Sequence, residues 1–143
     1  MTMEARRCVV ALAACLTAVA SATTFTRSVS KEEQAAKARR PTLVLTLDPT
    51  VGIAPTRIVL RADLVGGADD YQDFYCPSIE WNWGDGTKSE STFDCRPYQP
   101  GVSEIVRHFT VQHMFREGRY RVTFRLKRGE KELASARANV LIK

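Results

Sequence analysis

A chain of 143 residues with a net charge of +5 is long enough for one domain with a hydrophobic core. Most of the excess positive charge lies in residues 1–40, which leaves residues 41–143 with a net charge of about +1. Because a nucleic-acid-binding protein concentrates positive charge on its folded surface, this distribution argues against a nucleic-acid partner.

Residues 1–22 have the three parts of a secretory signal peptide. Arg6 and Arg7 form a positive start, residues 8–20 form an apolar run, and residues 20–22 form a small-residue cleavage site. The apolar run is too short to cross a bilayer comfortably, so we expect cleavage and no transmembrane span afterwards. Residues 12–15 also resemble a bacterial lipobox, so a lipoprotein anchored through Cys15 is an alternative, as is an uncleaved anchor. The predicted location is secreted, periplasmic or at the cell envelope.

Residues 23–40 are rich in charge and carry no apolar stripe that a helix could bury. Residues 31–40 could form two or three turns of marginal helix, because an isolated helix of this length is barely stable in water. We therefore interpret residues 23–40 as a solvated tether that ends at Pro41. The predicted domain comprises residues 41–143.

From Pro41 onward, apolar residues recur at every second position, which is the period of a half-buried strand. The pattern predicts seven strands around residues 43–47, 57–64, 79–83, 87–93, 105–115, 119–126 and 136–142. Turn residues at 48–52 and 128–130 and a polar loop at 66–77 separate them. The number and spacing of these strands predict an all-β fold, an immunoglobulin-like β-sandwich.

The segment from Trp81 to Thr87 characterises the predicted fold most sharply. Trp81 and Trp83 are two residues apart, so both rings lie on one face of a strand, together with Ile79. Residues 84–86, Gly-Asp-Gly, then supply the flexible backbone of a tight hairpin, in which Asp85 can accept backbone N–H bonds. We expect the two tryptophans in the core of the sandwich.

Cys76 and Cys95 flank this hairpin. If its turn centres on residues 85–86, cross-strand partners have numbers that sum to about 171, which places the two cysteines opposite each other. The pair predicts a structural disulfide, across the strands or at the base of the hairpin, in an oxidising compartment. A redox-active pair would need the close C-x-x-C spacing that is missing here.

Four short motifs occur in an order that resembles the PKD (polycystic kidney disease) domain. They are G-x-A-P at 52–55, W-x-W-G-D-G-T at 81–87, H-M-F at 113–115 and G-x-Y-x-V-T at 118–123. The resemblance covers residues 41–143; Trp83, Phe115 and Phe124 replace the family's usual Phe, Tyr and Leu. It implies a PKD-type immunoglobulin-like sandwich and a non-enzymatic adhesion or spacer module of an extracellular protein.

The sequence suggests no catalytic, cofactor or metal site. His108 and His113 stand beside no recognisable nucleophile motif or zinc-ligand spacing, and His113, in the H-M-F motif, is expected to form a hydrogen bond within the fold. Some PKD domains bind calcium through loop carboxylates, which makes Asp69, Asp70 and Asp73 candidates. Because these three lack the ligand spacing of an EF-hand loop, we interpret them as part of a solvated polar loop.

Two surfaces are candidates for binding a partner. The first is a basic face, which we interpret as a solvated surface that keeps the sheet from stacking; the alternative hypothesis is that it binds acidic glycans, lipopolysaccharide or an acidic partner. The second is a set of loop aromatics, which could stack on sugars, although we favour a role in covering the end of the core. The basic face comprises Arg119, Arg121, Arg125, Lys127 and Arg137; the loop aromatics are Tyr71, Phe74, Tyr75 and Tyr98.

These observations predict an exported, non-enzymatic PKD-type binding or adhesion module. Its partner is expected to be an extracellular or envelope protein. A carbohydrate-binding module for extracellular or envelope polysaccharide is the alternative. A third hypothesis, a membrane-tethered structural protein of the envelope, depends on the lipobox.

Overall fold

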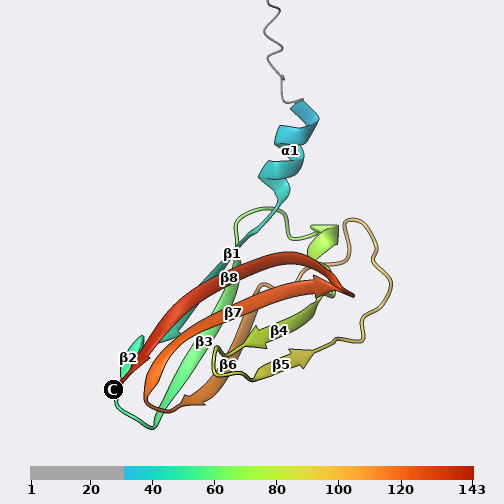
Figure 1. Ribbon diagram of the computed structural model, residues 1–143. Coiled ribbons are helices and arrows are strands. Elements are labelled where there is room, and N and C mark those ends of the chain that lie inside the picture. The colour runs from blue at the N-terminus through green and yellow to red at the C-terminus, as the bar shows by residue number, and fades with distance from the viewer. Residues whose placement is uncertain (1–30) are drawn as a thin grey trace, which may run out of the picture.

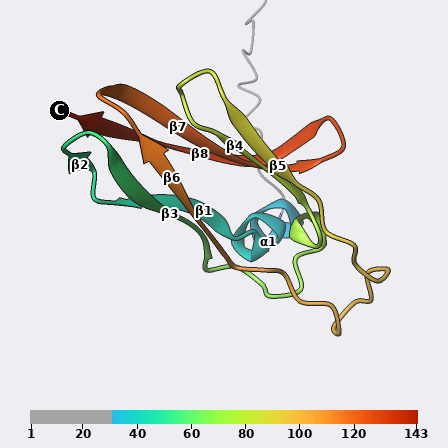
Figure 2. The ribbon, with the colours of Figure 1, turned by 90° about the horizontal axis from the view of Figure 1, so that it is seen from below.

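The computed structural model describes residues 31–143; the predicted signal peptide, the lipobox cysteine and residues 23–30 of the tether lie outside the described residues. Two β-sheets face each other, and a short helix, α1 (Lys31–Arg39), extends from one end of the sandwich (Figure 1). The view from below shows the two sheets as separate layers (Figure 2). No helix within residues 31–143 is long and apolar enough to cross a membrane.

The two sheets contain three and five strands. The three-stranded sheet has the order β1-β3-β6, with β1 at Thr42–Asp48, β3 at Thr56–Val65 and β6 at His108–Phe115. The five-stranded sheet has the order β2-β8-β7-β4-β5, with β2 at Val51–Gly52, β8 at Lys131–Ile142, β7 at Gly118–Arg128, β4 at Ser78–Asn82 and β5 at Lys88–Ser91. All pairs are antiparallel except β2 with β8. The predicted all-β sandwich is thereby confirmed.

Several elements differ in extent from the sequence prediction. β6 begins at His108, later than predicted, and the N–H of Ile105 donates to the carbonyl oxygen of Asp69 (2.8 Å) in another loop instead of to a strand. β8 begins at Lys131, earlier than predicted. The two-residue strand β2 lies within the predicted turn, and a 3₁₀ turn at Gln72–Phe74 lies within the predicted polar loop.

The hydrophobic core fills the space between the sheets. Its members follow the alternating parity of their strands, so each strand turns its apolar face inward. The central strands contribute Ile58, Leu60, Ala62, Val122, Phe124 and Leu126, all fully buried. Trp81 and Trp83 are also buried, and their rings stack nearly parallel with centroids 5.7 Å apart. The prediction that both tryptophans belong to the core is confirmed.

The connection between β4 and β5 is longer than a two-residue turn. The paired residues Asn82 and Lys88 have numbers that sum to 170, so the predicted sum of 171 is wrong by one. The N–H of Trp83 donates to the carbonyl oxygen of Thr87 (3.2 Å), which closes the connection. Gly84 has a φ of +77°, and a Cβ atom there would lie 2.7 Å from the carbonyl oxygen of Arg121 on β7. Glycine at position 84 therefore lets the connection pack directly against the backbone of β7.

The predicted disulfide is present between Cys76 and Cys95, with Cα atoms 6.1 Å apart. Neither cysteine belongs to a strand, because β4 starts at Ser78 and β5 ends at Ser91. The bond therefore lies beyond the base of the hairpin, and strand register does not set the pairing. It joins the loop before β4 to the long irregular segment between β5 and β6.

The described part of the tether is a nine-residue helix whose side chains are all exposed. Its end is fixed to the sandwich by two arginines. Arg39 pairs with Asp70 at 2.8 Å, while Arg40 donates to the carbonyl oxygen of Leu133 and lies over the ring of Phe74. The chain then enters β1 through the buried Pro41, which cannot continue a helix.

Candidate functional site

The outer face of the five-stranded sheet carries all five residues of the predicted basic face. Side chains of alternate β7 residues point to this face, and strand pairing aligns them in rows with residues of β8 and β4. No other element within residues 31–143 covers this face (Figure 2). The rows divide the face into two parts with different electrostatic character.

In the first part, carboxylates compensate the positive charges. Glu80 on β4 has a side chain only 5% exposed, and it accepts a hydrogen bond from its row partner Arg125. The Nζ of Lys127 lies 3.5 Å from the other oxygen of Glu80, and Arg125 also reaches Glu132 on β8 at 3.0 Å. Two of the five predicted basic residues are thus bound to carboxylates.

Sequence reasoning missed Glu80. Its burial alone would raise the pKa of its carboxyl, but hydrogen bonds with Arg125 and Glu90 and the positive charge of Lys88 lower that pKa below its usual range. The carboxylate is therefore ionised at neutral pH and compensates the neighbouring cations. Its parity, opposite to that of Trp81, was the signal that could have placed Glu80 on the outer face.

In the second part, three arginines have no such partner. Arg119, Arg121 and Arg137 are exposed, and no ion pair joins any of them to a carboxylate within residues 31–143. They occupy three successive rows of the sheet. The rows pair Arg119 with Leu141, Arg121 with Asn139, and Thr123 with Arg137.

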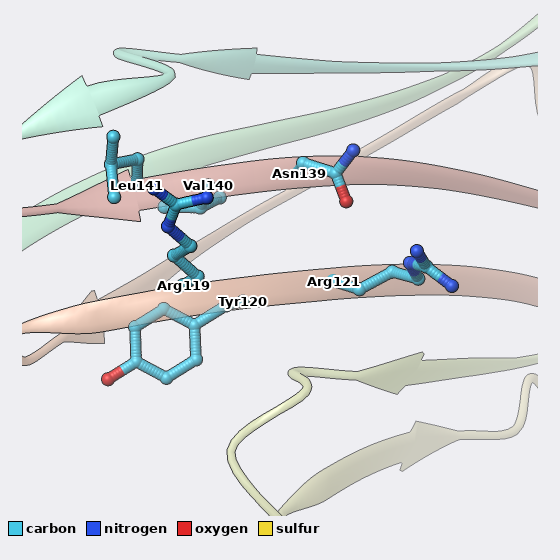
Figure 3. A pocket seen from close by; sticks show the side chains of 6 residues that line it. All are labelled: Arg119, Tyr120, Arg121, Asn139, Val140 and Leu141. Carbon is cyan, nitrogen blue, oxygen red and sulfur yellow. The ribbon is translucent and has the colours of Figure 1, made fainter.

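A groove runs over the first two of these rows. Its lining residues are Arg119, Tyr120, Arg121, Asn139, Val140 and Leu141, and we call it the arginine groove (Figure 3). The side chain of Arg119 reaches from β7 toward β8, where Leu141 lies, whereas the ring of Tyr120 extends away on the other side of β7 (Figure 3). The Tyr120 hydroxyl donates toward the carbonyl oxygens of Arg116 and Glu117, at 3.1 and 3.2 Å. Tyr120 is therefore fixed, and the guanidinium groups of Arg119 and Arg121 and the amide of Asn139 are donors available in the groove.

The loop aromatics pack against one another and against the core. Phe74 is 1% exposed and meets Tyr71 edge to face, so the hypothesis that its ring stacks on a sugar is wrong. Tyr75 and Tyr98 also meet edge to face, with ring centroids 5.4 Å apart. Their hydroxyls donate to the backbone carbonyls of Arg96 (2.9 Å) and Asp70 (2.7 Å). These contacts favour the covering role over a sugar site.

The three loop carboxylates do not form a cluster. Asp69 pairs with Arg107 at 2.6 Å and Asp70 with Arg39 at 2.8 Å, so each holds a different segment in place. Within residues 31–143, no three His, Cys, Asp or Glu side chains are close enough together to hold a metal ion.

His113 and Asp85 meet at the edge of the core. The Nε2 of His113 lies 3.1 Å from a carboxylate oxygen of Asp85, and the imidazole stacks on Trp83 with centroids 4.1 Å apart. Asp85 also accepts bonds from the N–H (2.9 Å) and the hydroxyl (2.6 Å) of Thr87. The predicted hydrogen bond of His113 within the fold is confirmed, as is the role of Asp85 as an acceptor. The other histidine, His108, pairs with Asp63 at 2.8 Å.

The contacts of Asp85 make the free energy of unfolding depend on pH in the acidic range. Burial alone would raise the pKa of Asp85, but the hydrogen bonds from Thr87 and His113 lower it below the ordinary value of 3.8. At a pH between the pKa of Asp85 in the folded chain and its pKa in the unfolded chain, the unfolded chain therefore binds more protons than the folded chain. The contribution of Asp85 to stability is complete above about pH 5 and is lost as the pH falls through the pKa of the folded state.

We expect Asp85→Asn to lower the free energy of unfolding at pH 7, with a difference from the wild type that shrinks toward pH 2. Urea unfolding followed by tryptophan fluorescence over this pH range measures the difference. Asp94→Asn changes an exposed loop carboxylate and is the matched control. It should leave the free energy of unfolding unchanged at both pH 7 and pH 2. A difference that stays constant from pH 7 to pH 2 would show that the charge of Asp85 contributes nothing.

The motifs that resemble the PKD domain lie close together at one side of the core. Trp83 and His113 stack, and Phe115 packs against Tyr120 with ring centroids 4.9 Å apart. Three of the four motifs are thus in mutual contact. No protein-family model matches the chain, and no curated protein matches it.

Proposed function

We propose that the chain is an exported, non-enzymatic binding module of the PKD type, which mediates protein–protein interaction at the cell envelope or outside the cell. The observation that carries this proposal is the uncovered outer face of the five-stranded sheet. There, Arg119, Arg121 and Arg137 stand together without a carboxylate partner among residues 31–143, and the first two line a groove that also has an apolar side chain, Leu141.

Three like charges in adjacent rows repel one another, so this arrangement costs stability in the free protein. In the first part of the same face, a carboxylate of the chain itself removes this cost, because Glu80 compensates the positive charges of Arg125 and Lys127. Arginine is also enriched at protein interfaces, where its planar group forms several hydrogen bonds at once. A partner that supplies negative charge would compensate the second part of the face in the same way.

Two further observations support an exported module of the PKD type. The Cys76–Cys95 disulfide is typical of proteins that fold in an oxidising compartment. The contacts among the W-G-D-G-T, H-M-F and G-x-Y motifs give these residues a shared role in the core. The carbohydrate-binding alternative has less support, since the loop aromatics that suggested it are packed and hydrogen-bonded.

The test is capture of a binding partner by the purified protein. Immobilised protein is incubated with an envelope extract, and each captured protein is then purified alone and tested for reversible binding. We expect at least one purified protein to bind with a measurable dissociation constant that increases with salt. If no purified protein binds, and isolated envelope polysaccharide does, the proposed function is wrong and the carbohydrate alternative replaces it.

A further inference from the structure

The spacing of the three arginines without an ion pair in residues 31–143 indicates the shape of the partner. Residues two apart on a strand are about 6.6 Å apart along its axis, so the three rows that hold Arg119 and Arg121 on β7 and Arg137 on the adjacent strand β8 repeat at this interval. Side chains on one face of an extended polypeptide repeat at the same interval. Carboxylates at every second position of an extended segment therefore match the three rows one to one.

The neighbouring rows show which chemical group this face binds. Arg125, on the same strand and the same face, binds two carboxylates of the chain itself, Glu80 and Glu132. The guanidinium fork matches the geometry of a carboxylate, which makes such pairs stronger than those of a point charge. Because Glu80 and Glu132 already compensate the cations of the neighbouring rows, an acidic segment that extended further would find no unpaired cation there. The site is therefore limited to three rows and three carboxylates.

The rest of the groove suits a polypeptide. Asn139 lies between the arginines, and its amide can both donate to and accept from a peptide group. Leu141 and its row partner Val51, which is 53% exposed, offer apolar surface beside the first arginine. The aromatic ring at the groove, Tyr120, points away from Arg121 and Asn139 and has its hydroxyl engaged, so it does not offer the stacking surface that a sugar needs (Figure 3).

On these grounds we propose that the arginine groove, together with Arg137, binds an extended acidic segment of a partner protein, in which three Asp or Glu residues alternate with other residues. This inference rests on the proposed function and names the partner's chemistry. Each carboxylate of the segment pairs with one guanidinium group, and the chain of the segment runs along the boundary between β7 and β8, beside Asn139 of β8.

Two capped, fluorescently labelled pentapeptides of the same composition and charge test the proposal. One alternates, Glu-Thr-Glu-Thr-Glu, and the other has its acids in a block, Thr-Glu-Glu-Glu-Thr. Fluorescence anisotropy at low salt measures their binding to the wild-type protein. We expect the alternating peptide to bind about fivefold more tightly, because only its carboxylates reach all three rows when it is extended.

Two triple variants with the same change in charge locate the site. R119Q/R121Q/R137Q removes the three unpaired arginines, while R57Q/R61Q/K131Q removes three exposed cations that lie elsewhere, two on the opposite sheet and one at the β7–β8 turn. The first variant should weaken binding of the alternating peptide by about tenfold, and the second by less than about twofold. Thermal unfolding of both variants verifies that they remain folded.

Three outcomes would overturn the inference. Equal binding of the two peptides would mean that the arginines act only as a diffuse positive field. Equal weakening by both triple variants would place the site elsewhere. Tighter binding of polygalacturonate, or of vesicles of phosphatidylcholine and phosphatidylglycerol, than of the alternating peptide would assign the groove to another class of partner. If a purified partner protein bound R119Q/R121Q/R137Q as well as the wild type, this inference would fail while the proposed function stood.

Discussion

Replacing Trp83 by alanine should lower the free energy of unfolding by about 4 kcal/mol, as expected for a large aromatic side chain deleted from a packed core. Trp83 is 2% exposed, and its ring stacks with the rings of both Trp81 and His113. Its indole N–H also donates to the hydroxyl of Ser89 (3.0 Å), which is lost with the ring. Urea unfolding at pH 7, followed by circular dichroism, measures the change.

Two controls separate the effect of the ring from that of the hydrogen bond. Trp83→Phe keeps an aromatic ring but lacks the N–H, and it should cost about half as much as the alanine variant. Phe93→Ala removes an aromatic side chain that is 45% exposed and should cost less than about 1 kcal/mol. A loss below about 1 kcal/mol for Trp83→Ala would contradict a central role for this ring in the core.

Replacing both Cys76 and Cys95 by serine should lower the free energy of unfolding by about 3 kcal/mol. The disulfide closes a loop with a sequence separation of 19, so its removal gives the unfolded chain more conformational freedom. The double variant also releases the segment between β5 and β6 from the loop before β4. Guanidinium unfolding measures the change.

Reduction of the wild-type protein is the matched control for the cysteine variant. With dithiothreitol present, the unfolding midpoint of the wild type should fall to that of the double variant, and the variant itself should not respond. If the wild-type midpoint were the same with and without dithiothreitol, the disulfide would not stabilise the fold. Binding of the alternating peptide should persist in the folded double variant, because the arginine groove lies on β7 and β8.

The period of two in the apolar residues predicted the sandwich correctly, because burial on one face controls which residues a strand turns inward. It did not predict the connection between β4 and β5. There, the N–H of Thr87 donates to the carboxylate of Asp85, and the N–H of Trp83 donates to the carbonyl oxygen of Thr87. These local hydrogen bonds, rather than the hydrophobic pattern, fix the register. The late start of β6, at His108 instead of residue 105, accompanies another local bond, from the N–H of Ile105 to the carbonyl oxygen of Asp69 in a loop far away in sequence.

The candidate site could be predicted only in part. The parity of β7 correctly placed its basic residues on one outer face. The compensation of Arg125 by Glu80 could not be predicted, because it depends on which residue of β4 stands opposite Arg125. A register of β4 shifted by one residue would have placed Glu80 in the core, which would have left Arg125 with Glu132 alone and Lys127 without its carboxylate.

Helix α1 and the arginine groove lie at opposite ends of the sandwich. Arg40, just after the helix, bonds to Leu133 near the start of β8, while the groove residues Asn139 and Leu141 lie near its end. Six to eight residues of strand separate these points, a distance of about 20–25 Å. In Figure 1 the helix and the C-terminal end accordingly mark opposite poles of the sandwich. If the molecule is attached through Lys31, Arg119, Arg121 and Arg137 lie toward the end of the sandwich far from the attachment point, and the rows with compensated charges lie nearer to it.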